Sequence, residues 1–370
     1  MSLVRPLEAA DVPAVAAMFQ RMLRNIRSPP PATLVDYMGK FYLETPEPSG
    51  GIDSLVHVDD TGRISGFVGV HALPMTIEGR PLRAAICGSL MVDGRDRDPM
   101  AGARLLKAFI DGPQDLSFSE TANEVSTRLW TRLRGVVLPQ YSLDWVRVIR
   151  PAGFAVDLAA SRFGSARMLK PAATVFDGLF RRRMKPGDKR WTAASTGAVS
   201  DAACASEIDS ARFAALVEPL TDQFALRPAW REIQLDRMFA DAAVKPDLGD
   251  LVFASVAAPN GVTIGAFAYH ACTGRIGRVL QVLARPGQAG AVVDSLVDDA
   301  ARRGLSGLRG RTQPALLEAM LTRRIAFVPV ASTVVHSRNA EVLRVLKDSQ
   351  AFLNGIAGES WSRLIGGRFD

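Results

Sequence analysis

Cysteine and histidine are both scarce in this chain of 370 residues, which has three of the former and four of the latter. Cys87, Cys204 and Cys272 are odd in number and far apart in the sequence. Neither a disulfide framework nor a CxxC metal site is supported by this spacing, so we expect buried thiols. No two histidines are three or four residues apart, which removes the helical zinc signatures. The sequence therefore predicts no metal site.

Long apolar runs are absent as well. No stretch approaches the ~18 uninterrupted apolar residues that a membrane-spanning helix needs. The N-terminal segment MSLVRPLEAADV has acidic residues where a signal peptide would have its apolar run. The composition, 48% hydrophobic and 22% charged, is that of a globular protein, and the length favours two domains. We therefore expect a cytoplasmic protein with no stable membrane insertion.

The net charge of +7 comes from one short segment. Lys and Arg balance Asp and Glu over residues 1–150 (17 each) and nearly so over 201–370 (19 against 18), whereas residues 151–200 have nine against three. A protein that binds nucleic acid over a broad face would have its positive charge within the folded domains, so we expect no nucleic-acid partner. The basic stretch 176–183 suits an anionic membrane surface or, as we expect, packs the two halves together with its arginines in solvent.

The first half of the chain predicts alternating strands and helices. The apolar spacing after Asp11 predicts a helix up to Leu23, and Pro29–Pro31 then interrupts the chain. Apolar runs separated by turn residues over 54–92 predict three strands. Further helices are predicted at 101–110 and 122–133, and further strands at 116–119, 136–138 and 145–148. The order β-α-β-β-β-α-β-α-β-β predicts an α+β fold.

The second half repeats this order of elements after a different middle segment. Residues 156–205 predict a basic linker with helices over about 156–168 and 172–183. Beyond it, Asn260-Gly261 marks a hairpin turn. The helices predicted there cover 209–224, 228–243, 288–303 and 314–324, with strands between them and near the end. We therefore predict two α+β domains, 1–155 and 206–370, each a mixed, mostly antiparallel sheet flanked by helices.

Residues Met91–Leu106 carry the most informative pattern. A strand ends there, small residues form a turn, and a helix begins, so unpaired backbone N–H groups lie beside the positive end of a helix dipole. Such an arrangement binds phosphate. An ordinary strand-to-helix connection is the alternative.

This segment resembles the pyrophosphate loop of the GNAT acyltransferase family, which has the form Gln/Arg-x-x-Gly-x-Gly/Ala. Arg97 fits the first position and Gly102 the last, while Met100 stands where the first glycine is usual. Residues Asn123–Trp130 resemble the family's Asn-x-x-Ala-x-x-Leu-Tyr helix. Trp130 replaces the tyrosine thought to protonate the departing thiolate, and an indole N–H cannot do so.

The resemblance covers about residues 3–150 and implies two GNAT-like domains in tandem, the second degenerate because its loop at Arg285-Pro286 does not match. It implies an N-acetyltransferase with acetyl-CoA as acyl donor, no metal, and a small-molecule or peptide amine as acceptor. The backbone N–H groups of Met91 and Val92 are implied to hold the carbonyl and the pantetheine arm. The remaining cofactor-binding positions that it implies are Arg97, Asp98, Met100, Ala101, Gly102, Ala103 and Asn123.

Catalytic candidates follow from the chemistry of acyl transfer, which needs a base for the incoming ammonium. Glu120 is the first candidate base, because it ends a strand near the point where strands four and five separate in such folds; a helix-capping Glu is the alternative. Asp93 is the second candidate, and a turn Asp is its simpler description. Tyr141 is a candidate acid in place of Trp130, although packing also explains it. We expect His336 to be structural.

Two other functions remain open at this stage. Met100 and Trp130 each replace a residue that the chemistry normally uses, so a catalytically silent acyl-CoA-binding or protein-interaction module is one alternative. The tandem arrangement also resembles the tRNA-dependent aminoacyltransferases that build peptidoglycan, although the neutral charge of both halves argues against it. The sequence does not determine the acceptor or the oligomeric state.

Overall fold

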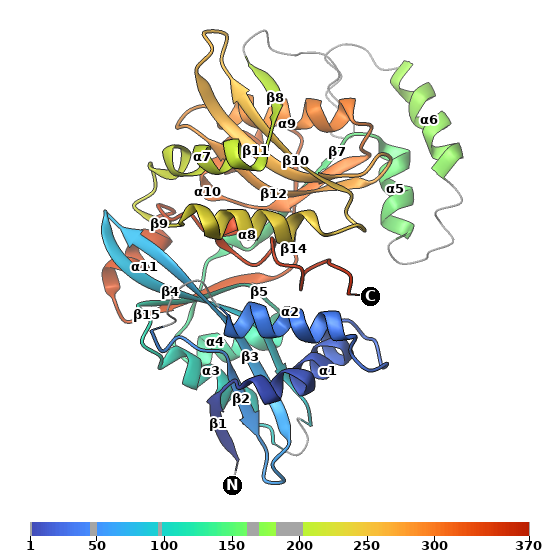
Figure 1. Ribbon diagram of the computed structural model, residues 1–370. Coiled ribbons are helices and arrows are strands. Elements are labelled where there is room, and N and C mark those ends of the chain that lie inside the picture. Colours follow the sequence, from blue (N-terminus) through green and yellow to red (C-terminus); the bar gives the residue numbers. More distant parts are fainter. Residues whose placement is uncertain (1, 45–49, 95–97, 161–169, 183–202, 370) are drawn as a thin grey trace.

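The computed structural model describes residues 2–44, 50–94, 98–160, 170–182 and 203–369. It forms two β-sheets, each flanked by helices, stacked one above the other in Figure 1. The predicted α+β class, with mixed and mostly antiparallel sheets, is confirmed. Within the described part of the chain, no helix is both long and apolar enough to cross a membrane.

The first half supplies most of the first sheet and the helices that cover it. Its elements are β1 (Leu3–Pro6), α1 (Val12–Leu23), α2 (Ala32–Leu43), β2 (Leu55–Val58), β3 (Ile64–Ile77), β4 (Arg80–Val92), α3 (Ala101–Ile110), β5 (Leu116–Ala122), α4 (Glu124–Arg132), β6 (Val136–Val137) and β7 (Leu143–Val148). Helix α2 was missed by the sequence analysis. Pro31 does not interrupt a helix here but is the N-cap of α2, where its missing N–H removes no helical bond.

Two helices follow the first half. α5 (Pro151–Ala160) begins earlier than predicted, and residues 161–169 of the predicted helix lie outside the described residues. α6 (Lys170–Arg182) is joined to α5 because the Asp177 carboxylate accepts hydrogen bonds from the Ala152 and Gly153 N–H groups, both at 2.8 Å. α6 lies at the outer edge of the upper half in Figure 1, so it does not pack between the two halves as we expected.

The second half supplies most of the second sheet. Its elements are β8 (Cys204–Ile208), α7 (Ser210–Thr221), β9 (Leu226–Pro228), α8 (Glu232–Ala243), β10 (Asp250–Ala257), β11 (Thr263–Ala271), β12 (Ile276–Ala284), α9 (Ala289–Arg302), β13 (Gly307–Arg311), α10 (Pro314–Leu321), β14 (Ala326–Pro329), β15 (Ser332–Ser337) and α11 (Ala340–Lys347). The predicted Asn260-Gly261 turn joins β10 and β11, and Gly261 has the positive φ of 82° that this turn requires.

The two sheets exchange a strand. The first has the order β1-β2-β3-β4-β5-β15-β6, with β9 paired to β3, and the second has the order β14-β7-β13-β12-β11-β10-β8. β15 of the second half therefore lies between β5 and β6, and β7 of the first half lies between β13 and β14. The division of the strands between the two sheets therefore does not coincide with the predicted domain boundaries at residues 155 and 206. These boundaries stay a prediction.

The three cysteines differ in their surroundings. Cys87 on β4 is buried, as expected, but Cys204 is exposed and Cys272 is half-buried. The expectation of three buried thiols was therefore wrong for two of them. Cys204 is the first residue of β8 and Cys272 directly follows β11, so neither lies in the packed centre of a strand, which explains their exposure.

Candidate active site

The candidate site lies where β4 and β5 separate. These strands pair in parallel from Ala84–Leu116 to Ile86–Phe118, although β4 continues to Val92 and β5 to Ala122. On its other edge, β4 has a bulge at Ser89, whose φ is 45°. A bulge bends its strand and increases the local twist. The two strands therefore diverge beyond Ile86 and leave a gap in the sheet.

This gap is open and forms a cleft of about 400 Å³. Its walls come from four parts of the chain that are distant in sequence. They are α1 and α2 (Phe19, Leu23, Arg24, Phe41, Tyr42), β3 and β4 (Gly69, His71 and Ile86–Leu90), β5 and α4 (Ser119, Thr121, Ala122, Asn123, Ser126), and the C-terminal segment (Gly358, Glu359, Trp361, Ser362, Leu364, Ile365). The cleft therefore needs both ends of the chain.

A pair of glycines forms the floor of the cleft. Gly69 of β3 and Gly88 of β4 are directly opposite each other in the sheet, so their missing side chains leave one face bare. A Cβ on Gly69 would lie 2.5 Å from the Tyr42 hydroxyl, and a Cβ on Gly88 would lie 3.0 Å from Glu359 Oε1. The Tyr42 hydroxyl and the Glu359 carboxyl therefore occupy the space above this glycine pair.

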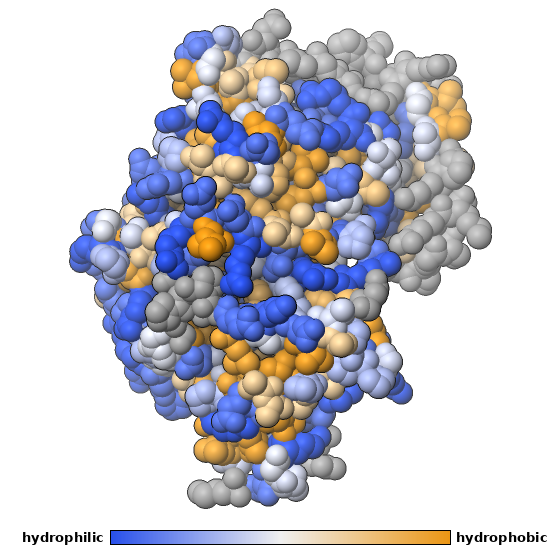
Figure 2. All heavy atoms as spheres, in the orientation of Figure 1, coloured by the Kyte–Doolittle hydropathy of each residue, from blue (hydrophilic) through white to orange (hydrophobic). Residues whose placement is uncertain are grey.

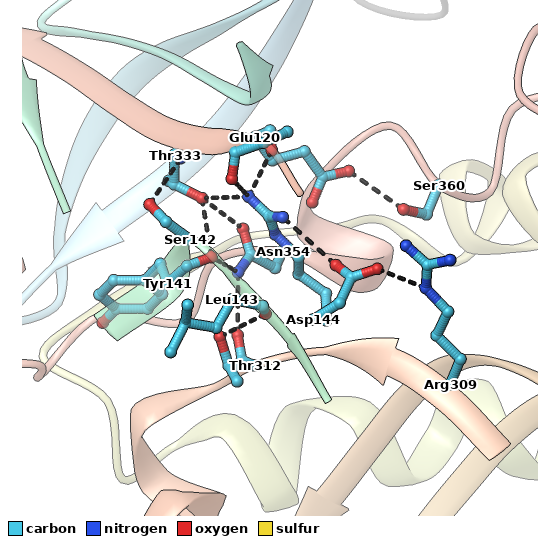
Figure 3. A network of polar contacts seen from close by, with 12 residues as sticks. Glu120, Tyr141, Ser142, Leu143, Asp144, Arg309, Thr312, Thr333, Asn354 and Ser360 are labelled. Carbon is cyan, nitrogen blue, oxygen red and sulfur yellow. Dashed lines mark hydrogen bonds and ion pairs between the residues drawn. The ribbon is translucent and has the colours of Figure 1, made fainter. Parts of the chain in front are cut away.

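The half-buried Glu359 faces a fully buried acid, Glu120. Glu120 Oε1 accepts a hydrogen bond from the Glu359 N–H at 2.6 Å. It also accepts one from the Ser360 hydroxyl at 3.2 Å (Figure 3). Burial raises the pKa of Glu120, but these two donors and Arg311 favour its charged form. Burial and the Glu120 charge raise the pKa of Glu359 to about 8. Near neutral pH Glu359 is therefore mostly protonated.

A rigid polar network holds Glu120 from behind (Figure 3). Arg311 donates from Nη2 to the Glu120 carbonyl oxygen at 2.7 Å and to the Thr333 hydroxyl at 3.2 Å. Its Nη1 donates to Asp144 at 3.3 Å, and Asp144 also accepts from Arg309 Nε at 2.7 Å. The network joins residues of both sheets, so the position of Glu120 is fixed by the contact between the two halves.

The C-terminal segment that carries Glu359 is anchored on the second half. Lys245 is 1% exposed and donates from Nζ to the Ser360 carbonyl oxygen at 2.6 Å, and burial lowers the pKa of its ammonium to about 7. The Gln281 side chain accepts the Ile356 N–H at 3.1 Å. The Trp361 ring is 5% exposed and packs in the core beneath α7 and α8. Because these contacts fix the residues on either side of Glu359, they hold Glu359 at the cleft.

The predicted catalytic residues lie in three different surroundings. Glu120 lies directly behind the cleft, as described. Tyr141 does not line it; its buried hydroxyl donates to the Ala351 carbonyl oxygen at 2.8 Å, and burial raises its pKa. We therefore correct its assignment as an acid to a packing role. Asp93 is paired with Arg21 at 2.8 Å and Arg63 at 3.2 Å, which suits a turn residue and not a base.

The predicted donor-binding residues surround the end of β4. Met91 and Val92 are buried, and the Asp93 N–H donates to the Ser65 carbonyl oxygen at 2.8 Å. Hydrogen bonds of neighbouring antiparallel residues point to opposite edges, so the Val92 N–H is directed toward the gap and the Met91 N–H toward β3. Asn123 lines the cleft and caps α4 by accepting the Ser126 N–H at 2.9 Å. Trp130, on the same helix, is fully buried in the core.

The first turn of α3 fits a phosphate group only in part. The Met100 N–H donates to Asp98 Oδ1 at 3.1 Å, and the Ala101 N–H donates to the Asp98 carbonyl oxygen at 3.3 Å. The next two N–H groups, of Gly102 and Ala103, have no partner within a helix by its geometry. The Met100 side chain is 57% exposed, and Gly102 and Ala103 are themselves partly exposed. Gly102 and Ala103 are thus the two residues whose N–H groups fit a phosphate.

Arg97 and Asp98 are the remaining residues of the predicted pyrophosphate loop. Arg97 lies outside the described residues. The Asp98 carboxylate is an ion-pair partner of Arg104 and lies 3.4 Å from His57 Nε2. Its negative charge is therefore neutralised locally. Asp98 serves the fold by capping the loop, and its role toward a ligand stays a prediction.

Among the described residues, the corresponding gap in the second sheet is nearly filled. β12 and β13 also pair in parallel, from Ile276–Gly307 to Arg278–Arg309, and then separate. Residues 355–356 fill that gap, and a volume of only about 10 Å³ remains. At the start of α9, a Cβ on Gly290 would lie 2.3 Å from Arg323 Nη2, so an arginine covers the first turn of this helix. The open gap of the first half is the better candidate for a binding site.

Two functional candidates were missed by the sequence analysis, Glu359 and Tyr42. No local pattern marks either of them. Glu359 lies in a segment that the sequence left without a defined structure, and Tyr42 lies on the missed helix α2. Within the described ranges, no three side chains of His, Cys, Asp or Glu come together as they would at a metal ion.

Several solved structures resemble this one, although no family profile and no curated protein match its sequence. The structure resembles a GCN5-related N-acetyltransferase from Anabaena variabilis (TM-score 0.57, 9% identity, 92% of this chain and 73% of that one). It also resembles a probable N-acyltransferase of unknown function from Enterococcus faecalis V583 (0.56, 9%, 94% and 74%) and a GCN5-related N-acetyltransferase from Kribbella flavida (0.52, 12%, 91% and 71%). The chain thus has the fold of the GCN5-related N-acetyltransferases.

Proposed function

We propose that the protein is an N-acyltransferase that moves an acyl group, in the simplest case acetyl, from a coenzyme A thioester to an amine. The observation that carries this proposal is the Glu359 carboxyl, which lies above Gly88 in the gap between β4 and β5 with Glu120 behind it. A carboxylate with a pKa raised to about 8 is matched to taking a proton from an ammonium group. The fold of the similar structures supports the same reaction class.

The residues around the gap have distinct roles in this proposal. Glu359 takes the proton of the incoming amine, whose nitrogen forms a C–N bond with the thioester carbonyl carbon. The C–S bond then breaks, and sulfur leaves with the electron pair. The Val92 N–H is positioned to donate to the carbonyl oxygen, as oxyanion donors do. The N–H groups of Gly102 and Ala103 would hold a phosphate of the donor.

Tyr42 is our candidate for protonating the thiolate. Burial raises the pKa of its hydroxyl, so the phenol keeps its proton at neutral pH. Its oxygen lies above Gly69, beside the glycine that faces Glu359. A thiolate with a pKa of ~8.5 also leaves without help, so Tyr42 contributes less than Glu359 to the rate.

Release of free thiol from acetyl-CoA in the presence of a panel of primary amines tests the proposal. Glu359→Gln should lower kcat/KM by about 10²–10³, the usual contribution of a general base. Glu318→Gln, an exposed residue of α10, removes the same charge away from the cleft and should leave the rate unchanged. Binding of acetyl-CoA without thiol release for any amine would instead indicate a catalytically silent binding module.

A further inference from the structure

A second cavity of about 200 Å³ lies beside the cleft, between helices α2 and α8. One face of α2 (Tyr37, Lys40, Phe41, Glu44) and one face of α8 (Gln234, Arg237, Met238, Asp241) form its sides. In Figure 1 these two helices run across the front of the molecule at the boundary between the halves. In Figure 2 hydrophilic residues border this band, with apolar residues exposed beside them. The cavity is therefore reached from the boundary between the halves.

The cavity and the cleft share a wall. Phe41, His71, Ile86, Gly358 and Trp361 line both of them. Glu359, which follows Gly358, lines only the cleft. A ligand in the cavity would therefore have one end next to the proposed base, on the side away from α4.

Aromatic rings dominate the shared wall. The Phe41 and His71 rings stack with centroids 5.6 Å apart, and Trp361 meets them at 5.7 Å and 5.5 Å. The cavity is smaller than the ~300–1,000 Å³ of drug-sized ligand pockets. Flat apolar walls and small size favour one aromatic group over a peptide or a long polar chain.

The charged residues at the cavity do not select a polycation. Lys40 and Arg237 balance Glu44 and Asp241 in number. The Tyr37 hydroxyl donates to the Asp241 carboxyl at 2.5 Å, and burial raises the pKa of Asp241. No surplus of negative charge remains on the residues that line the cavity.

Two residues of the cavity have a buried nitrogen without a hydrogen-bond partner. They are Trp230 Nε1 and His71 Nδ1. An indole N–H donates only, so its missing partner is an acceptor such as an ether, hydroxyl or carbonyl oxygen. A buried donor left without a partner is destabilising, and a ligand oxygen would relieve this.

We propose that this cavity binds the acceptor, and that the acceptor is a small aromatic primary amine with a hydrogen-bond acceptor oxygen. The ring packs against Phe41 and Trp361, the oxygen accepts from Trp230 Nε1, and the amine reaches Glu359 past Gly358. This assignment of the substrate class rests on the proposed function.

A double-mutant cycle between the protein and the ligand tests the inference. The amines are 4-methoxybenzylamine and 4-methylbenzylamine, which differ in the oxygen, and methylamine, which is too small to need the cavity. The protein variants are wild type and Trp230→Phe, which keeps a ring but removes the N–H. We expect kcat/KM to be at least tenfold higher for the methoxy amine than for methylamine. Trp230→Phe should lower it about 3–10-fold for the methoxy amine only, as for one neutral hydrogen bond.

The outcomes separate the two proposals. Spermidine is added to the assay as a polycationic amine. A higher kcat/KM for spermidine than for the aromatic amines would overturn the assignment of the cavity, as would equal effects of Trp230→Phe on the other three amines. Thiol release with none of the amines would contradict the proposed function, and calorimetric titration of 4-methoxybenzylamine would then still decide the cavity. Binding weakened by Trp230→Phe supports the inference, and binding that is absent or unaffected refutes it.

Discussion

The coupling between the carboxyls of Glu120 and Glu359 gives the sharpest prediction. Glu120→Gln removes the negative charge behind Glu359 but keeps an oxygen that accepts the Glu359 N–H. Because the Glu120 charge raises the pKa of Glu359, its removal should lower that pKa. Two like unit charges a few Å apart at an effective dielectric constant of about 20 repel by a few kcal/mol, so we expect the pKa of Glu359 to fall by at least about one unit.

The direction of the effect on activity follows from the role of Glu359. A base works in its deprotonated form, so kcat/KM should rise with pH through about 8 in the wild type. In Glu120→Gln the rise should occur at a lower pH. At pH 6.5 the variant should then have roughly tenfold more of the active form than the wild type, relative to each protein's own plateau.

The assay is thiol release from acetyl-CoA with a saturating amine between pH 5.5 and 9.5. Glu318→Gln is the control, because it removes an equal charge from an exposed position of α10. Thermal unfolding of each variant checks that the fold is intact. A midpoint that stays at the wild-type pH in Glu120→Gln, or moves to higher pH, would refute the assignment of Glu359 as the base and Glu120 as its partner.

Three further outcomes are expected. Asn123→Ala removes the cap of α4 and should lower the free energy of unfolding in urea by about 1 kcal/mol. Gly88→Ala places a Cβ 3.0 Å from Glu359 Oε1 and should lower kcat at least tenfold, whereas Gly39→Ala, in open space on α2, should not. A fragment of residues 1–155 lacks β15, so we expect it to aggregate on size-exclusion chromatography; a folded monomer would contradict this.

The sequence predicted the elements well where the signal is local. α3 was predicted at residues 101–110 and lies there, because its apolar residues repeat on one face and the turn before it is polar. The β10–β11 hairpin was predicted from two apolar runs with Asn260-Gly261 at the turn between them, since few residues other than glycine adopt the positive φ found there. Helix α2 was missed because three prolines precede it, and a proline can begin a helix as well as end one.

The exchange of β7 and β15 could not be predicted. Both strands have ordinary alternating sequences, and nothing local distinguishes pairing within one half from pairing across halves. For the same reason, only part of the candidate site could be predicted from the sequence. Glu120 and Asn123 lie in motifs of the first half, whereas Glu359 reaches them from more than two hundred residues away. Only the folded chain shows that they are neighbours.

The second half consequently has a larger role than a degenerate copy would have. The C-terminal segment closes the gap between β12 and β13 with residues 355–356, and a few residues later it places Glu359 in the gap between β4 and β5. Because Gln281 and Lys245 hold this segment on the second half, the position of the proposed base depends on contacts that the first half does not make. The same segment that leaves the second gap without room for a ligand therefore completes the first one. An open gap in both sheets would leave Glu359 without its support, so the way the segment is anchored explains why, in the described part of the chain, one of these two gaps is open and the other is filled.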